Sequence, residues 1–261
     1  MMKHKKIIVI AVSIVLVVVL AACANNDESV IPEYITIYGP VTSQQFSTAL
    51  TELDLSAWEL TCEAIEPLRY MVNLTSLQLS GNRINDLTPL AGLTNLIALG
   101  LNQNEISDIA PLSALRNLDW LTLSSNQISD VRPLASLTEL TELILNHNQI
   151  SDITPLSELT NLTGLYLSLN QISNISPLAD LVNLEMLNLG DNEISDITPL
   201  AGLTRLTHLV LLNNALTDIA PLAELPDLTV LFLGGNPIED WSPVDHITFD
   251  AIREDIPTVV N

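Results

Sequence analysis

The chain has 261 residues, and its 31 Asp and Glu against 9 Lys and Arg give a formal net charge of −22. This excess of negative charge excludes a protein that binds nucleic acid through a basic surface, because phosphate backbones would repel it. A hydrophobic content of 48% excludes a disordered chain, and two cysteines are too few for a disulfide scaffold. The composition is therefore that of an acidic chain with enough apolar residues to form a core.

The N-terminal segment 1–22 has the layout of a secretory signal peptide. Residues 1–6 carry all three lysines of the chain, and residues 7–22 form an apolar run that ends in small residues before Cys23. This run is shorter than the roughly 17 to 25 residues that a membrane-spanning helix needs. The pattern favours a cleaved signal peptide over an uncleaved transmembrane helix.

The end of this segment, Leu20-Ala21-Ala22-Cys23, resembles the signal box of bacterial lipoproteins. The resemblance implies export to the bacterial cell envelope, cleavage before Cys23 and a lipid on its sulfur. Each buried methylene contributes about 0.8 kcal/mol, so two or more acyl chains would anchor the protein to a membrane without spanning it. We expect residues 23–40 to be a polar tether and residues 41–73 to form an N-terminal cap with an irregular first repeat.

From residue 74 the sequence repeats with a 22-residue period. The pattern Leu-x-Leu-x-x-Asn places an asparagine in every unit, at Asn82, Asn104, Asn126, Asn148, Asn170, Asn192, Asn214 and Asn236. So strict a period predicts a solenoid in which like side chains stack on one another, because no single unit could bury its leucines alone. The repeats are expected over residues 74–247, and residues 248–261 are expected to cap the C-terminal end.

The run Asn-x-Ile-Ser-Asp-Ile-x-Pro-Leu, found at residues 104–112 and 192–200, resembles the bacterial leucine-rich repeat of the internalin family. The resemblance implies an α/β solenoid that is right-handed and curved, with a parallel β-sheet on the concave side and 3₁₀ or irregular turns on the convex side. It also implies adhesion or host contact, a role that some members of the family have and others lack.

Two polar columns of the repeat have structural interpretations. The Asn column is predicted to satisfy backbone groups of adjacent turns, which would otherwise cost about 1–3 kcal/mol each. A row of aspartates that includes Asp108 and Asp130 is predicted to accept hydrogen bonds from backbone N–H groups at the start of each turn. A calcium ladder is the alternative, but calcium-binding solenoids use a shorter Gly- and Asp-rich repeat, and Asn174 interrupts the row.

Motifs for catalysis or cofactor binding are absent from the sequence. It contains no H-E-x-x-H, C-x-x-C, G-x-S-x-G or P-loop pattern, so we expect no enzyme, no cofactor and no metal site. Cys62 falls in a unit that departs from the period, because Leu55 and Leu79 lie two positions further apart than the equivalent leucines of later units. We expect Cys62 to be a small buried apolar residue, and a reactive thiol is the alternative.

The variable positions of each predicted strand should face solvent on the concave side, since their neighbours face the core. The residues predicted to bind a partner there are Trp120, Glu142, Ile144, Tyr166, Met186, His208, Val210, Leu212 and Phe232. Strands about 4.8 Å apart would separate Trp120 from Phe232 by about 24 Å, the scale of a protein footprint. Trp, Tyr and Met are also residue types enriched at protein interfaces.

These observations predict a non-enzymatic, lipid-anchored cell-surface protein that binds a protein partner through its concave face and is itself a monomer. A glycan- or cell-wall-binding module and a purely architectural spacer are the alternatives. The negative charge would favour a basic partner by electrostatic attraction, or would serve only to keep the repeats soluble.

Overall fold

The structure is a computed structural model that describes residues 31–40, 43–245 and 247. The chain divides into two compact units, Met1–Glu33 and Tyr34–Asn261, and the second contains all the strands and helices described below. The predictions for the signal peptide, Cys23 and the C-terminal cap at 248–261 concern residues outside those described. Among the described residues, no helix combines the length and apolarity that crossing a membrane requires.

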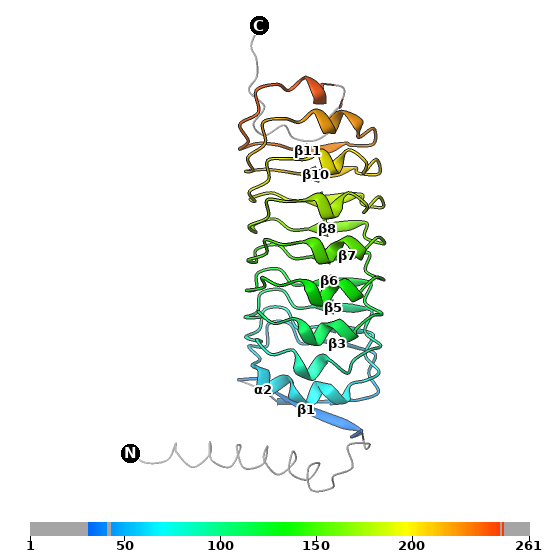
Figure 1. Ribbon diagram of the computed structural model, residues 1–261. Coiled ribbons are helices and arrows are strands. Elements are labelled where there is room, and N and C mark those ends of the chain that lie inside the picture. Colours follow the sequence, from blue (N-terminus) through cyan, green and yellow to red (C-terminus); the bar gives the residue numbers. More distant parts are fainter. Residues whose placement is uncertain (1–30, 41–42, 246, 248–261) are drawn as a thin grey trace, which may run out of the picture. The chain divides into compact units, whose positions relative to one another are not determined.

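The second unit is a stack of coils whose strands form one parallel sheet (Figure 1). The strands, in sheet order, are β3 (Glu52–Asp54), β4 (Ser76–Gln78), β5 (Ala98–Gly100), β6 (Trp120–Thr122), β7 (Glu142–Ile144), β8 (Gly164–Tyr166), β9 (Met186–Asn188), β10 (His208–Val210) and β11 (Val230–Phe232). Leucine pairs with leucine at the centre of each pair, as Leu77 does with Leu99. The solenoid predicted from the 22-residue period is confirmed, and so is the parallel sheet that the resemblance to leucine-rich repeats implies.

Opposite the sheet, each coil contains a short 3₁₀ turn (Figure 1). These turns are η1 (Glu66–Tyr70), η2 (Thr88–Leu90), η3 (Ala110–Ala114), η4 (Arg132–Ser136), η5 (Thr154–Glu158), η6 (Ser176–Leu178), η7 (Thr198–Leu200), η8 (Ala220–Glu224) and η9 (Ser242–Val244). Each begins with a proline at its first or second position, where the fixed φ of proline suits the turn and no N–H is lost.

The core is a continuous column of leucine and isoleucine between the sheet and the 3₁₀ turns. In a typical coil, Leu143 comes from the strand, Leu145 follows the strand, Ile150 and Ile153 come from the next bend and Leu156 comes from the turn, and all are at most 1% exposed. Because equivalent side chains of neighbouring coils lie above and below, every interior coil is buried on both sides.

The N-terminal end departs from the repeat. A hairpin of β1 (Tyr34–Tyr38) and β2 (Ser43–Ser47) precedes the sheet, and helix α2 (Cys62–Ile65) comes before η1. Ile35 and Ile37 of β1 join the leucine core, so the hairpin covers its first coil. The predicted tether over 23–40 is therefore wrong at its end: alternation of apolar and polar residues makes 34–38 a strand of the cap.

The first coil is two residues longer than the others. Strand β3 pairs with β4 through Glu52 and Ser76, whereas β4 pairs with β5 through Ser76 and Ala98, a smaller separation in sequence that the later pairs repeat. At the other end, Leu231 and Leu233 of the last coil remain 8% and 6% exposed, because no further described coil covers them.

Candidate binding surface

The Asn column links each coil to the one before it. Asn148 accepts a hydrogen bond from Ile128 N at 3.0 Å and donates to the carbonyl oxygens of Leu123 and Leu145 at 3.0 Å each. The equivalent asparagines make the same bonds, and Asn82 accepts from two backbone N–H groups of the irregular first coil. Backbone groups at the bend are thus paired by one side chain per coil, which assigns the column to the scaffold.

A second row of asparagines, which the sequence interpretation missed, precedes the first leucine of each coil. Asn95 Nδ2 donates to Val72 O at 2.9 Å, and Asn117 Nδ2 donates to Thr94 O at the same distance. Asn73, Asn161 and Asn183 make the equivalent bond. The row is incomplete, because glutamate, arginine and aspartate replace asparagine at positions 139, 205 and 227. A search for polar residues that recur every 22 positions could have found this second row.

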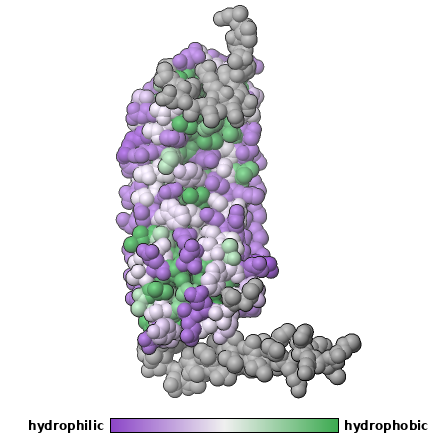
Figure 2. Space-filling view, turned by 180° about the vertical axis from the view of Figure 1, so that it is seen from behind, coloured by the Kyte–Doolittle hydropathy of each residue, from purple (hydrophilic) through white to green (hydrophobic). Residues whose placement is uncertain are grey.

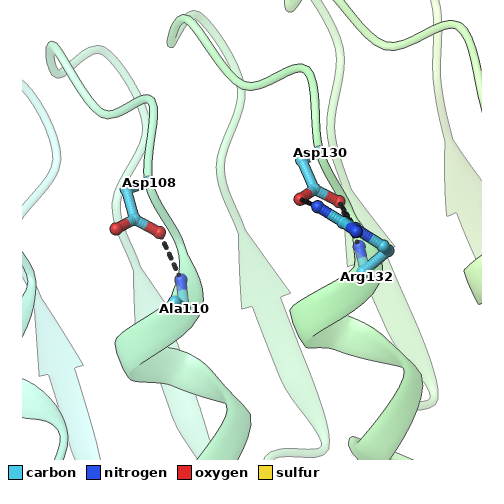
Figure 3. Close-up of polar contacts among 4 residues, drawn as sticks. All are labelled: Asp108, Ala110, Asp130 and Arg132. Atoms are coloured by element: carbon cyan, nitrogen blue, oxygen red, sulfur yellow. Dashed lines mark hydrogen bonds and ion pairs between the residues drawn. The ribbon is translucent and has the colours of Figure 1, made fainter.

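The aspartate row lies at the start of the 3₁₀ turns (Figure 3). Asp108 accepts from Ala110 N at 2.8 Å, and Asp130 accepts from Arg132 N at 3.0 Å. The Arg132 side chain also bonds both oxygens of Asp130, so side-chain and then backbone hydrogen bonds lower the pKa of Asp130 to about 2. Asn174 keeps the same backbone bond to Ser176 N at 3.0 Å, which needs an oxygen acceptor and no charge.

The aspartates of this row bond to the protein backbone. Within the described part of the chain, no three His, Cys, Asp or Glu side chains are grouped so that they could hold a metal ion.

The solvent-facing side of strands β3–β11, which we call the sheet face, carries the nine residues predicted to bind a partner. Met186 and His208 are exposed, and the remaining seven are half-buried. None of the nine lies in the core, whose leucines alternate with them along each strand. Not every position on this side is open, however, because Thr122 is only 1% exposed.

Tyr166 lies across its own strand at the middle of the sheet face. A Cβ added to Gly164 would come within 3.3 Å of the Tyr166 ring and 3.4 Å of Glu142 Cγ. The Tyr166 hydroxyl donates to Met186 Sδ at 3.4 Å. Burial of the ring, and then the negative charge of Glu142, raise the pKa of Tyr166 above its usual value. A glycine in β8 thus lets one aromatic ring connect β7 to β9.

Towards the C-terminal end, apolar side chains are grouped around a second glycine. Gly190 lies between Val210 and Leu212, whose Cγ1 and Cβ atoms would be 3.5 and 3.7 Å from an added Cβ. Phe232 follows Val210 in register on β11. Figure 2, seen from the strand side, shows hydrophobic surface near this end of the stack and a second area nearer the N-terminal end.

The charged side chains of the sheet face are acidic, and its strands also contain one histidine. Strands β3–β11 contain Glu52, Asp54 and Glu142, and they contain neither lysine nor arginine. The nearest arginine in sequence to this side, Arg205, pairs with Glu185 at 2.6 Å. The face therefore combines apolar side chains with uncompensated carboxylates.

The turn that follows each of the strands β4–β11 contains a residue with left-handed backbone, which the sequence interpretation also missed. The column consists of Gly81, Gln103, Ser125, His147, Leu169, Asp191, Asn213 and Gly235. Glycine adopts this conformation without strain, whereas a leucine at φ 57° with half of its surface exposed has no such freedom. The sequence did contain a signal for this conformation, because glycine occupies this position of the repeat in the first and last of these units, at Gly81 and Gly235.

Cys62 is not the buried apolar residue that we expected. It is partly exposed at the start of α2, and its Sγ donates to Asn85 Oδ1 at 2.7 Å. The same sulfur accepts from the backbone N–H groups of Asn85 and Asp86 at 3.2 and 3.3 Å. It thus bonds the bend of the next coil at the place where the extra two residues alter the repeat.

Comparison with known proteins agrees with this geometry. The family described as Leucine Rich repeats (2 copies) matches residues 72–114, 116–158, 160–202 and 204–246. Among curated proteins, no match was found.

Solved structures with the same fold include two internalins of Listeria monocytogenes strain 4b F2365. Internalin inlF is 41% identical with a TM-score of 0.74, and the match covers 76% of this chain and 58% of that one. Internalin C2 is 38% identical with a TM-score of 0.58, and the match covers 78% of this chain and 81% of that one.

A more distant match is the Arabidopsis receptor kinase HAESA, whose ectodomain was solved in complex with an IDA peptide hormone. It is 26% identical with a TM-score of 0.62, and the match covers 71% of this chain and 34% of that one. The family match spans more than half of the chain, and its repeats are similar to those of internalins. The chain therefore belongs to the leucine-rich repeat family.

Proposed function

We propose that this chain is a non-enzymatic bacterial cell-surface protein, anchored by lipid at Cys23, that binds a protein partner through its sheet face. One observation carries the binding proposal: large apolar side chains recur on the solvent-facing side of β6–β11, where packing of the core does not require them. Large apolar side chains on a solvent-facing surface are characteristic of interaction sites.

The residue types on the sheet face support a protein partner. Trp120, Tyr166 and Phe232 supply large, rigid contact areas, and Tyr and Trp are the types that most often dominate interface energies. In the same fold, the HAESA ectodomain binds a peptide hormone. A partner that presents apolar side chains would bury these rings together with Met186 and Val210.

The charge of the sheet face supports a partner with basic side chains. Glu142 is the register neighbour of Trp120 on one side and of Gly164 on the other, so a lysine or arginine beside an apolar side chain of the partner would meet it. Electrostatic attraction of this kind acts mainly on the association rate, which should fall as salt concentration rises.

The binding proposal is tested by truncating the rings of the sheet face. Trp120→Ala and Tyr166→Ala should reduce capture of the partner on intact cells by a photoreactive residue at position 186, while the melting temperature changes little. Val182→Ala is the matched control, since Val182 is 51% exposed and lies outside the strands of the sheet. Unchanged capture by both ring variants would contradict the role of the rings, absence of capture by the wild-type chain would leave an architectural spacer, and capture of polysaccharide alone would indicate a glycan-binding module.

The anchoring proposal has a separate test. Cys23→Ser should abolish incorporation of labelled fatty acid and move the chain from the membrane fraction to the soluble fraction, because the sulfur that carries the lipid is lost. Cys62→Ser is the control and should leave both properties unchanged. A wild-type chain that incorporates no lipid would contradict the proposal.

A further inference from the structure

We propose that the outer face of the N-terminal hairpin, with Tyr34 and Tyr38, lies on the lipid surface that holds the anchor and sets the direction in which the repeats project. This inference rests on the lipid anchoring at Cys23 proposed above. It assigns a membrane-contacting role to a part of the cap that the leucine-rich repeats themselves do not explain.

The two faces of the hairpin differ in chemistry. Ile35 and Ile37 of β1 are 4% and 0% exposed and belong to the leucine core. Tyr34 and Tyr38 alternate with them and are 54% and 39% exposed, the largest side chains on the outer face. Opposite them in register, β2 presents Ser47 and Ser43. Aromatic rings that carry a hydroxyl, flanked by uncharged polar side chains that include Gln45, suit the boundary between lipid and water, where one end of the ring is apolar and the other is hydrated.

The hairpin carries no charged side chain. From residue 34 to residue 51 the sequence contains no Asp, Glu, Lys, Arg or His, although the chain as a whole has a formal charge of −22. A carboxylate held against a bilayer would lose hydration and would be repelled by anionic lipids. The uncharged segment 34–51 avoids that cost at the end of the repeats that adjoins the proposed anchor.

The distance from the anchor allows the contact. Only residues 24–33 separate Cys23 from Tyr34. A chain of this length reaches at most about 36–40 Å when extended, so an anchored hairpin stays within that distance of the bilayer. Because the hairpin is held near lipid by the anchor, even a weak affinity of its outer face would be sufficient to orient it. A protein partner would gain no such advantage from the position of the hairpin along the chain.

The orientation can be measured with the lipidated full-length chain in vesicles of phosphatidylethanolamine and phosphatidylglycerol. A fluorophore is attached in a Cys62→Ser background either through Thr36→Cys, on the outer face of β1, or through Asp227→Cys, an exposed position near the last coil. The quencher is a nitroxide on the lipid headgroup. We expect quenching at position 36 and none at position 227. Adding Tyr34→Ser and Tyr38→Ser should cause loss of the quenching at position 36 without a change in melting temperature.

The possible results separate this inference from the anchoring proposal. If the wild-type chain does not float with vesicles, both are overturned. If it floats but the label at position 36 is not quenched, or is quenched equally with and without the tyrosines, only the hairpin inference fails. Sedimentation of Cys23→Ser without lipid tests a second copy as the occupant: a dimer that Tyr34→Ser dissociates would also overturn the inference.

Discussion

The core side and the solvent side of the sheet differ in how far their residues vary. At the centre of each strand the core side holds leucine without exception, from Leu53 in β3 to Leu231 in β11. On the solvent side of the same strands, one register column runs from Ser76 through Trp120 and Gly164 to Val230. Close packing in the buried core restrains the side chains on one side of the sheet, so that side preserves the fold and the solvent side is available for recognition.

The largest expected effect tests this difference at two adjacent residues. Leu143→Ala should lower the free energy of unfolding by about 3–4 kcal/mol, because it leaves a cavity in a core that is closed on both sides. Ile144→Ala, on the solvent side of the same strand, should cost about 1 kcal/mol or less. Urea denaturation followed by circular dichroism measures both. Similar losses for the two variants would show that Ile144 also belongs to the core.

The second effect concerns the polar part of the scaffold. Asn148→Ala should cost about 2–3 kcal/mol, since it leaves buried backbone groups of two coils without partners. Asn148→Asp keeps the acceptor for Ile128 N but loses both donors, so its loss should also be substantial. The control is Asn95→Ala, which removes a single bond at an exposed position and should cost about 1 kcal/mol or less. Urea denaturation followed by circular dichroism measures these losses. Equal losses of unfolding free energy at positions 148 and 95 would contradict the assignment of the Asn column to the scaffold.

A third, stabilising change would sharpen the contrast between scaffold and surface. Leu169→Asn should raise the free energy of unfolding by about 0.5–1 kcal/mol, because asparagine tolerates the left-handed backbone better than leucine does. Val182→Asn removes an equally exposed apolar side chain outside this column and should change stability little. If both variants shift the urea midpoint equally, the gain comes from surface polarity and not from backbone strain.

The smallest effect is a dependence on pH at the turns. The lowered pKa of Asp130 means that its carboxylate stabilises the fold above the unfolded value of 3.8, and that this contribution is lost as pH falls towards about 2. Asp130→Asn should therefore be slightly less stable than wild type at pH 6 and equal to it near pH 2. Urea midpoints at both pH values provide the measurement.

The natural amide at position 174 gives the converse experiment. Asn174→Asp should introduce a smaller pH dependence of the same sign, since the backbone acceptor position is the same but Ser176 stands where Arg132 bonds to Asp130. If the urea midpoint of Asn174→Asp differs from that of the wild type by the same amount at pH 6 and at pH 2, the charge of the aspartate row does not contribute to stability.

The repeated part of the fold was predictable because the sequence samples it many times. A leucine or proline that recurs once in every repeat identifies its own structural position, and the parallel register follows from stacking equal units. The β1–β2 hairpin occurs once, so no second example distinguished Tyr34–Tyr38 from a polar tether. For the same reason the bonds of Cys62 to the next coil were not foreseen, as they arise in the single coil of irregular length.

The sheet face was predictable only as a set of positions. Alternation along the strand places Tyr166 and Met186 on the solvent side. That the Tyr166 ring lies over Gly164 and beside Glu142 depends on the absence of a Cβ in one coil and the side chain of another, which period alone does not specify. Thr122 shows the same limit, because its position predicts exposure while its neighbours leave it almost fully covered.

The in-register pairing of strands has a consequence for how such a protein can change over generations. Removal or duplication of one whole repeat joins backbone edges that already match, so an altered gene would still encode a closed ladder of strands. Each such event between β6 and β11 would shift the spacing between Trp120 and Phe232 by one strand, about 4.8 Å, with no new side chain required. Binding specificity could then change in discrete steps with the number of repeats, before any point mutation alters the recognition residues.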